Sequence, residues 1–209
     1  MKKVKSIELV EKKRSFANKR REYFVHVNGE ENHSFDIKEN SNFFKNLIRM
    51  MSGGKDAMAK FKMSLLDASG SELYKIKKGV GPFEMAPFKL CDNVGNPIYI
   101  ASNKIKMSDD SFVEILNPSK EILFKSGLEN GRTWFPVYLY ESEKAETGIM
   151  TISGEPFAVM SKEKSGGLGR MHSGNVYKFS LAEETDNQET VAMLINFMVA
   201  IDFGYDNRN

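Results

Sequence analysis

Short segments in which apolar and polar residues alternate fill most of this 209-residue chain. Clear examples are KSIELV, EYFVHV, AKFKMSLL and NVYKFSL, and most such segments are bounded by Gly, Asn or Pro. A strand with one face in a core and the other in water alternates with this period of two. The pattern therefore predicts about 12 or 13 strands and a mainly β fold.

Three segments in the middle of the chain form a repeat with a period of 25 residues. Each copy has an apolar pair, then Asp or Asn at the start of a turn, and then a second strand. Side chains of Asp and Asn hydrogen-bond to nearby backbone groups, and Gly adopts positive φ without strain, so each copy is predicted to be a β-hairpin. Successive hairpins form an antiparallel meander. The copies are LLDASGSELYKI from Leu65, LCDNVGNPIYIA from Leu90 and ILNPSKEILFKS from Ile115.

A segment near the C-terminus shows no alternation. From Val191 to Phe203 only Asn196 and Asp202 are polar. The run is shorter than the roughly 20 apolar residues that a membrane-spanning helix needs, and it has no polar face to expose to water. We therefore predict a helix over residues 188–204 that is surrounded by protein. Asn196 is expected to find a partner inside, and Asp202 to reach water.

Signals at both ends of the run support a helix. Either Thr185 with Gln188 or Asp186 with Glu189 has the spacing of a capping box. Gly204 is placed to end the helix.

The predicted strands and the predicted helix explain each other. A sheet of this size curls, and closing it removes exposed edges. Eight strands leave room only for side chains, whereas about eleven enclose a helix. We predict a single domain over residues 1–209, built as a closed antiparallel barrel of about 12 strands around the C-terminal helix. Residues 1–20 are predicted to be a peripheral basic strand or arm.

A second, short amphipathic helix is predicted near residues 42–52, before Gly53 and Gly54. Its polar face carries Lys45 and Arg49, which are one turn apart. The helix is either a lid over one mouth of the barrel or a segment that touches a membrane.

Charge is unevenly distributed along the chain. The net charge is +2, but residues 1–62 hold 15 Lys and Arg against 8 Asp and Glu, whereas residues 63–209 hold 15 against 20. Such polarity indicates an anionic partner. The alternative is that these lysines simply solvate outward strand faces. Candidate residues for an anionic headgroup are Lys75, Lys77 and Lys78, with Lys45 and Arg49.

The repeat and the apolar C-terminal segment resemble the tubby C-terminal-like superfamily, which includes tubby proteins, phospholipid scramblases and LURP-one-related proteins. The resemblance covers about residues 20–205. It implies a roughly twelve-stranded barrel around a hydrophobic C-terminal helix, and it implies headgroup binding by basic residues as in tubby proteins. LAEETDNQET occupies the place of the proposed calcium segment of scramblases, but it lacks alternating Asp residues and a central Gly, so no metal is expected. The resemblance rests on LLDASGSELYKIKKG, LCDNVGNPIYIASNKIK, ILNPSKEILFKSG and VAMLINFMVAIDF.

The sequence contains no recognised catalytic motif. A single cysteine, Cys91, excludes an internal disulfide and indicates a reducing compartment. The three histidines lack zinc-ligand spacing. The glycine-rich loop 165–175 lacks phosphate-loop spacing but offers Arg170 and His172 as weaker anion-binding candidates. We expect no cofactor and no metal.

These observations predict a non-enzymatic binding or scaffold module. It is expected to be cytoplasmic and monomeric and to dock on anionic phospholipid headgroups. A protein-interaction module without a lipid role is the first alternative, and an enzyme without a recognised motif is another. A nucleic-acid binder is the last, and it would use a basic stretch followed by two aromatic residues: Lys12, Lys13, Arg14, Lys19, Arg20 and Arg21, then Tyr23 and Phe24.

Overall fold

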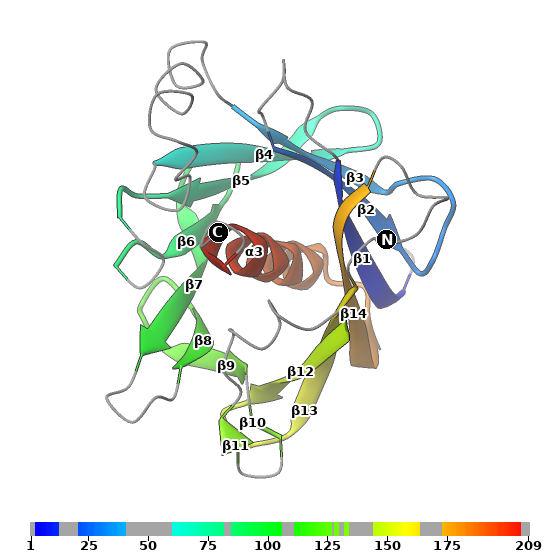
Figure 1. Ribbon diagram of the computed structural model, residues 1–209. Coiled ribbons are helices and arrows are strands. Elements are labelled where there is room, and N and C mark those ends of the chain that lie inside the picture. The colour runs from blue at the N-terminus through cyan, green and yellow to red at the C-terminus, as the bar shows by residue number, and fades with distance from the viewer. Residues whose placement is uncertain are drawn as a thin grey trace.

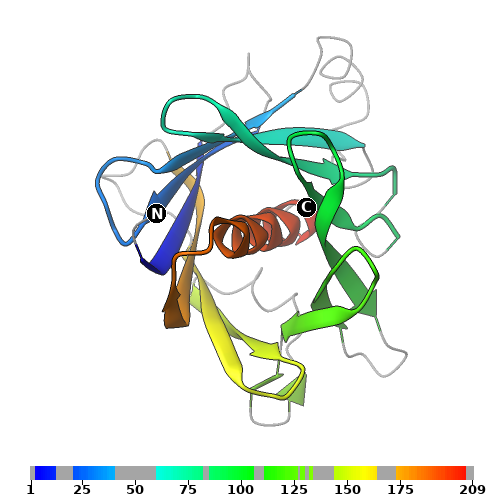
Figure 2. The same cartoon turned by 180° about the vertical axis from the view of Figure 1, so that it is seen from behind.

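The computed structural model describes residues 3–12, 21–40, 60–81, 85–105, 111–126, 128–129, 132–133, 144–163 and 173–205. Within these residues twelve strands form a closed antiparallel barrel, and one helix, α3 (Gln188–Tyr205), runs through its middle (Figures 1 and 2). The predicted fold class is confirmed.

The barrel strands in chain order are β1 (Val4–Lys12), β2 (Glu22–Val27), β3 (Phe35–Glu39), β4 (Phe61–Asp67), β5 (Glu72–Lys78), β6 (Phe88–Cys91), β7 (Pro97–Ile105), β8 (Ser111–Leu116), β9 (Ile122–Ser126), β12 (Lys144–Thr151), β13 (Pro156–Glu163) and β14 (Ser173–Thr185). A separate two-stranded sheet contains β10 (Leu128–Glu129) and β11 (Arg132–Thr133). β1 pairs with both β2 and β14 and so closes the barrel. The N-terminal strand therefore belongs to the barrel wall and is not peripheral.

Helix α3 is buried on all sides. Each residue from Val191 to Ile201 is at most 2% exposed. The helix packs against β1, β6, β7 and β14, and the ring of Phe197 lies 5.9 Å from that of Phe179 on β14. Burying a large apolar side chain stabilises a fold by roughly 1.5–3 kcal/mol. The prediction of a helix enclosed by protein is confirmed.

The start of α3 differs from the prediction. Asn187 is the N-cap, because its Oδ1 accepts hydrogen bonds from the backbone N–H groups of Glu189 (2.9 Å) and Thr190 (3.3 Å). The side chain of Thr185 instead accepts a hydrogen bond from the Asn187 backbone N–H at 3.2 Å. The amide side chain of Asn187 satisfies two helix donors directly, so neither predicted capping box is needed.

The two polar residues of the apolar run also differ from expectation. Asn196 is 1% exposed, and its Oδ1 has no hydrogen-bond partner among the described residues. Asp202 was expected to reach water but is fully buried. Its partners are described below.

Four hairpins in the described part of the chain have the same turn. In each, a side-chain oxygen at the first turn position accepts a hydrogen bond from the backbone N–H four residues later, at 2.8–3.1 Å. The first positions are Asp67, Asp92, Asn117 and Thr151. The first three confirm the predicted repeat. The fourth copy was not recognised in the sequence because Thr replaces Asp or Asn.

Two sequence predictions lie outside the described residues, namely the short helix near 42–52 and most of the loop 165–175. None of the helical structure in the described segments has the length and apolar character that crossing a bilayer requires.

The repeated turn predicts a stabilising substitution. Its fourth position has positive φ and is Gly70, Gly95 or Gly154 in three hairpins but Lys120, with φ 66°, in the β8–β9 hairpin. A left-handed conformation costs a residue with a Cβ about 1–2 kcal/mol, part of which is offset by the greater chain entropy of Gly. Lys120→Gly is therefore expected to raise the free energy of unfolding by about 0.5–1 kcal/mol in urea denaturation.

Gly154→Ala is the matched control, because a Cβ there meets nothing within 4 Å but φ is 87°. It is expected to lower the free energy of unfolding by about 1 kcal/mol. A loss of stability in Lys120→Gly would contradict this account of the turn.

Candidate functional site

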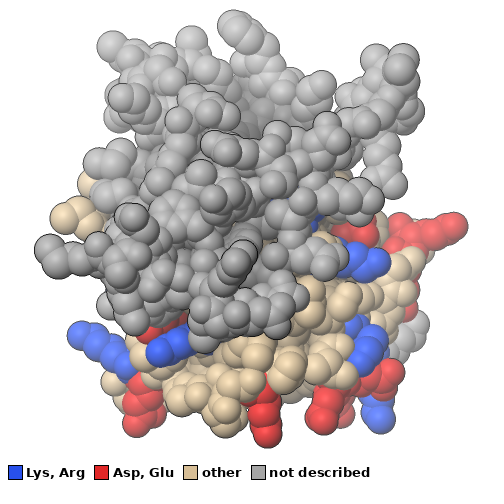
Figure 3. Space-filling model, turned by 60° about the horizontal axis from the view of Figure 1, so that its bottom comes forward, with Lys and Arg blue, Asp and Glu red and all other residues tan. Residues whose placement is uncertain are grey.

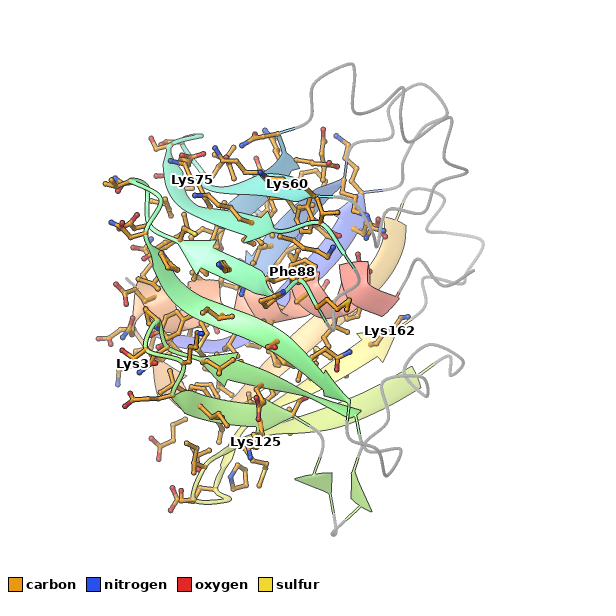
Figure 4. All side chains as sticks on the ribbon, turned by 90° about the vertical axis from the view of Figure 1, so that its left-hand side faces the viewer. Lys3, Lys60, Lys75, Phe88, Lys125 and Lys162 are labelled. Carbon is orange, nitrogen blue, oxygen red and sulfur yellow. The ribbon has the colours of Figure 1, made fainter. Side chains whose placement is uncertain are left out.

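The two ends of the barrel carry different chemistry. One end, the turn end, holds the turns at residues 28–34, 67–71, 92–96, 117–121 and 151–155 together with the start of α3 (Figure 4, left). At the other end, the far end, α3 finishes. The turn end is acidic in the described residues, with Glu30, Glu31, Asp67, Glu72, Asp92, Glu121, Glu155, Glu183, Glu184, Asp186 and Glu189 against Lys3, Lys5, Lys75 and Lys120 and the ammonium of Lys77, which reaches Gly95.

Toward the far end, the inward-facing side chains change from apolar to charged. On β3, for example, the inward series is Phe35, Ile37 and then Glu39. On β13 it is Ala158, Met160 and then Lys162. These charges are covered, because each is at most 6% exposed. The inward charged residues of this layer are Glu11, Arg21, Glu39, Lys78 and Lys162.

The end of α3 is joined to this layer by the Asp202 cluster, which consists of Arg21, Tyr23, Tyr177 and Asp202. The carboxylate of Asp202 accepts hydrogen bonds from Arg21 Nη1 (2.8 Å), Tyr23 Oη (2.6 Å) and Tyr177 Oη (2.8 Å). The side chains of Arg21 and Asp202 are both 0% exposed. The Arg21 backbone N–H also donates to Glu39 Oε2 at 3.1 Å.

Burial determines the protonation of this cluster. Removal from water raises the pKa of Tyr23 well above its ordinary value, and the nearby Asp202 carboxylate raises it further. Tyr23 therefore stays neutral and keeps its proton as a donor. Because the cluster is fully buried and its members pair with one another, its role is structural. It joins the end of α3 to β2 and β14.

The outer face of the barrel carries a second charged feature, the lysine row of Lys62, Lys77 and Lys89. Lys62 on β4 lies directly opposite Lys77 on β5, and Lys77 lies directly opposite Lys89 on β6. All three face outward, because the flanking residues on each strand point into the core. Like charges directly opposite one another on a sheet are destabilising.

At three other places in the described barrel wall, an outward lysine instead lies opposite an acid on a neighbouring strand. The face shown in Figure 3 likewise has Lys and Arg interspersed with Asp and Glu. The opposite-charge pairs are Lys178 with Glu8, Lys38 with Glu22 and Lys125 with Glu114.

The lysine row forms no ion pair within the described structure, but Lys62 interacts electrostatically with the Glu72 carboxylate. Lys77 Nζ donates to the neutral backbone carbonyl of Gly95 at 3.3 Å. Among the described residues, no carboxylate forms an ion pair with Lys62, Lys77 or Lys89. Lys60 is exposed just before β4, on the same side of the barrel (Figure 4).

The structure separates the lysines that the sequence grouped together. Lys75 and Lys77 share the outer face of β5, but Lys75 pairs with Glu72 at 3.0 Å and donates to the carbonyl of Asn93. Lys78 faces the interior and is 2% exposed. The remaining candidates, Lys45, Arg49, Arg170 and His172, lie outside the described residues.

Sequence reasoning missed Lys62 and Lys89. The tight turn that starts at Asp67 sets the register of β4 and β5, so the pairing of Lys62 with Lys77 could have been predicted from it. No tight turn joins β5 to β6, so the sequence contains no comparable signal for the pairing of Lys77 with Lys89. The proposed nucleic-acid stretch is also corrected in part, because Arg21 and Tyr23 belong to the buried Asp202 cluster.

Comparison of the chain with protein-family models, with curated proteins and with solved structures gave no match. In the described residues, no group of His, Cys, Asp or Glu side chains is arranged to hold a metal ion. Cys91 is buried, and burial raises the pKa of its thiol.

The Asp202 cluster predicts a large loss of stability when its charge is removed. Asp202→Asn leaves the Arg21 guanidinium buried without this counter-charge and is expected to lower the free energy of unfolding by about 3 kcal/mol or more. The double variant Arg21→Met, Asp202→Leu removes both charges and is expected to be more stable than Asp202→Asn. Urea denaturation measures both.

A matched pair of tyrosine variants provides the control. Tyr177→Phe removes a donor to Asp202 and is expected to cost about 1 kcal/mol. Tyr99→Phe is expected to cost little, because the Tyr99 hydroxyl has no hydrogen bond within the described residues. If Asp202→Asn lowered the free energy of unfolding by less than about 0.5 kcal/mol, which is the size of an ordinary surface change, the structural role of the Asp202 cluster would be refuted.

Proposed function

We propose that this protein is a non-enzymatic binding module that docks reversibly on anionic phospholipid headgroups, and that the lysine row makes the contact. The observation that carries the proposal is the direct opposition of Lys62, Lys77 and Lys89 on three neighbouring strands. In this role the protein is peripheral to the membrane.

The physical reason is that a bound anion relieves the repulsion within the row. Each pair of like charges directly opposite costs up to about 1 kcal/mol in the unbound sheet. Lysine binds phosphate as a compact point charge with several donors. Near an anionic membrane each lysine contributes about 1 kcal/mol of attraction. The same residues that weaken the sheet therefore favour contact with a surface rich in phosphate groups.

The distribution of charge also orients the molecule. An anionic membrane repels the acidic groups of the turn end and attracts the row on the outer wall of β4, β5 and β6, where the Lys77 ammonium reaches Gly95. The resemblance of the repeat and the C-terminal segment to the tubby-like superfamily, whose tubby members bind headgroups through basic residues, is a second support.

Neutralising the row is expected to abolish docking. The triple variant Lys62→Gln, Lys77→Gln, Lys89→Gln should bind phosphatidylserine-containing vesicles about 100-fold more weakly than the wild type in low-salt sedimentation. Its free energy of unfolding should rise by about 0.5 kcal/mol or more, because the like-charge pairs are gone. Binding by the wild type should fall as salt is added.

The matched control is Lys3→Gln, Lys120→Gln, Lys178→Gln, which removes the same charge from exposed lysines elsewhere. It should bind like the wild type. Equal recovery of the wild type with phosphatidylcholine and phosphatidylserine vesicles would overturn the proposal. In that case, capture of one protein partner by both wild type and triple variant would favour a protein-interaction module.

A further inference from the structure

A β-bulge in β5 brings an acidic side chain to the face of the barrel that carries the lysine row. Leu65 on β4 lies opposite Tyr74. The next residue, Leu66, lies opposite Glu72, so β5 has one extra residue between the two pairs. Residues three apart on a regular strand point to opposite faces. The bulge reverses this, and Glu72 shares the outer face with Lys75.

Glu72 is bound by lysines on one side and by a neutral donor on the other. Its Oε1 lies 3.0 Å from Lys75 Nζ, and it interacts electrostatically with Lys62. Its Oε2 accepts a hydrogen bond from Ser64 Oγ, which in turn accepts one from Asn40 Nδ2 at 2.8 Å. Partial burial raises the pKa of Glu72, but hydrogen bonds from Ser64 and Lys75 and the two lysine charges outweigh it and lower the pKa. Glu72 is therefore a carboxylate at neutral pH.

The neutral donors hold Glu72 independently of the lysines. Ser64 is 5% exposed, and the backbone N–H of Asn40 donates to the carbonyl of Lys62 at 2.9 Å. Neither donor carries a charge, so an anion that attracts the lysines does not attract these groups away from Glu72. The ion pair with Lys75 is partly exposed, and such pairs are weak. The lysine side chains can thus move to a bound anion while the carboxylate stays.

The hairpin repeat shows that the turn does not require an acid at this position. The same bulge occurs in the other three hairpins of the described chain, where the equivalent residues are Pro97, Ile122 and Pro156. Glu72 is the one charged residue at this position in the four hairpins. It lies in the hairpin that supplies Lys62 and Lys77 to the row. The acid therefore accompanies the lysines rather than the turn.

We infer that Glu72 is a built-in competitor of the headgroup, which holds Lys75 and attracts Lys62 in the unbound protein and gives up both when an anionic lipid binds. The inference rests on the proposed function and adds a regulation of the same site. Lys75 shares the outer face of β5 with Lys77 (Figure 4), so its release adds a fourth lysine to the contact. Glu72 thereby sets how negative a surface must be before the protein docks, because the lipid has to outcompete a fixed carboxylate.

Vesicle sedimentation tests the competition. Glu72→Gln keeps an acceptor for Ser64 but loses the charge, and it should bind phosphatidylserine-containing vesicles about five-fold more tightly than the wild type at low salt. Glu121→Gln is the matched control. It removes the same charge from an exposed carboxylate, which accepts a hydrogen bond from Asn117 Nδ2 at 2.6 Å in another hairpin. It should bind like the wild type.

A second pair of variants identifies the released lysine. Added to Glu72→Gln, the substitution Lys75→Gln should abolish the gain in binding. Lys120→Gln, which removes the same charge from an exposed lysine of another turn, should leave the gain in place.

NMR follows the displacement itself, with dihexanoyl phosphatidylserine as a soluble probe. The side-chain carboxyl signal of Glu72 and the ε-methylene signal of Lys75 should shift during the titration. Their midpoint should equal that of the ε-methylene signal of Lys77, because one binding event moves all three groups.

Two failures are distinguishable. Wild-type binding by Glu72→Gln, equal gains in Glu72→Gln and Glu121→Gln, or an unshifted Lys75 signal would refute the competition. Headgroup docking would survive each of these results as long as the triple variant of the lysine row still failed to bind. Equal recovery of the wild type with neutral and anionic vesicles would instead remove the proposed function and the competition together.

Discussion

The structure depends on the mutual burial of α3 and the barrel. A helix that is apolar on every side has no stable position in water, and a barrel of this size has an interior that side chains alone do not fill. The helix fills the interior of the barrel, and the barrel shields the helix from water. As a result, the residues from Val191 to Ile201 are almost completely removed from water. Strand closure is part of the same constraint, because an open sheet would expose both its edges and the helix.

The two ends of the barrel are held together by different interactions. At the turn end, four hairpins of the described chain have the same kind of hydrogen bond, in which the side chain of the first turn residue accepts from a backbone N–H of the same turn. The first of these turns starts at Asp67 and the last at Thr151. At the far end, Asp202 fastens α3 to the wall through Arg21, Tyr23 and Tyr177. The lysine row lies apart from these buried groups, on the outer face of the barrel wall.

The sequence predicted the fold because its strongest signals are local. The apolar run from Val191 and the turns at Asp67, Asp92 and Asn117 each follow from neighbouring residues, and together they required a barrel around a helix. The candidate site depends on register and burial, which are long-range. Lys89 meets Lys77 through a pairing that no tight turn sets, and Asp202 is buried because Arg21, almost the whole chain away, neutralises it. Lys78 was misplaced for a simpler reason, since strand alternation turns it inward beside the outward Lys77.

Native-state hydrogen exchange tests most directly whether α3 and the barrel form one cooperative unit. The account predicts that the amides from Leu194 to Val199 exchange only through global unfolding, with the same opening free energy and denaturant dependence as the most protected amides of β1 and β14. Exchange of these helix amides through a separate opening of lower free energy, while β1 and β14 stay protected, would contradict it.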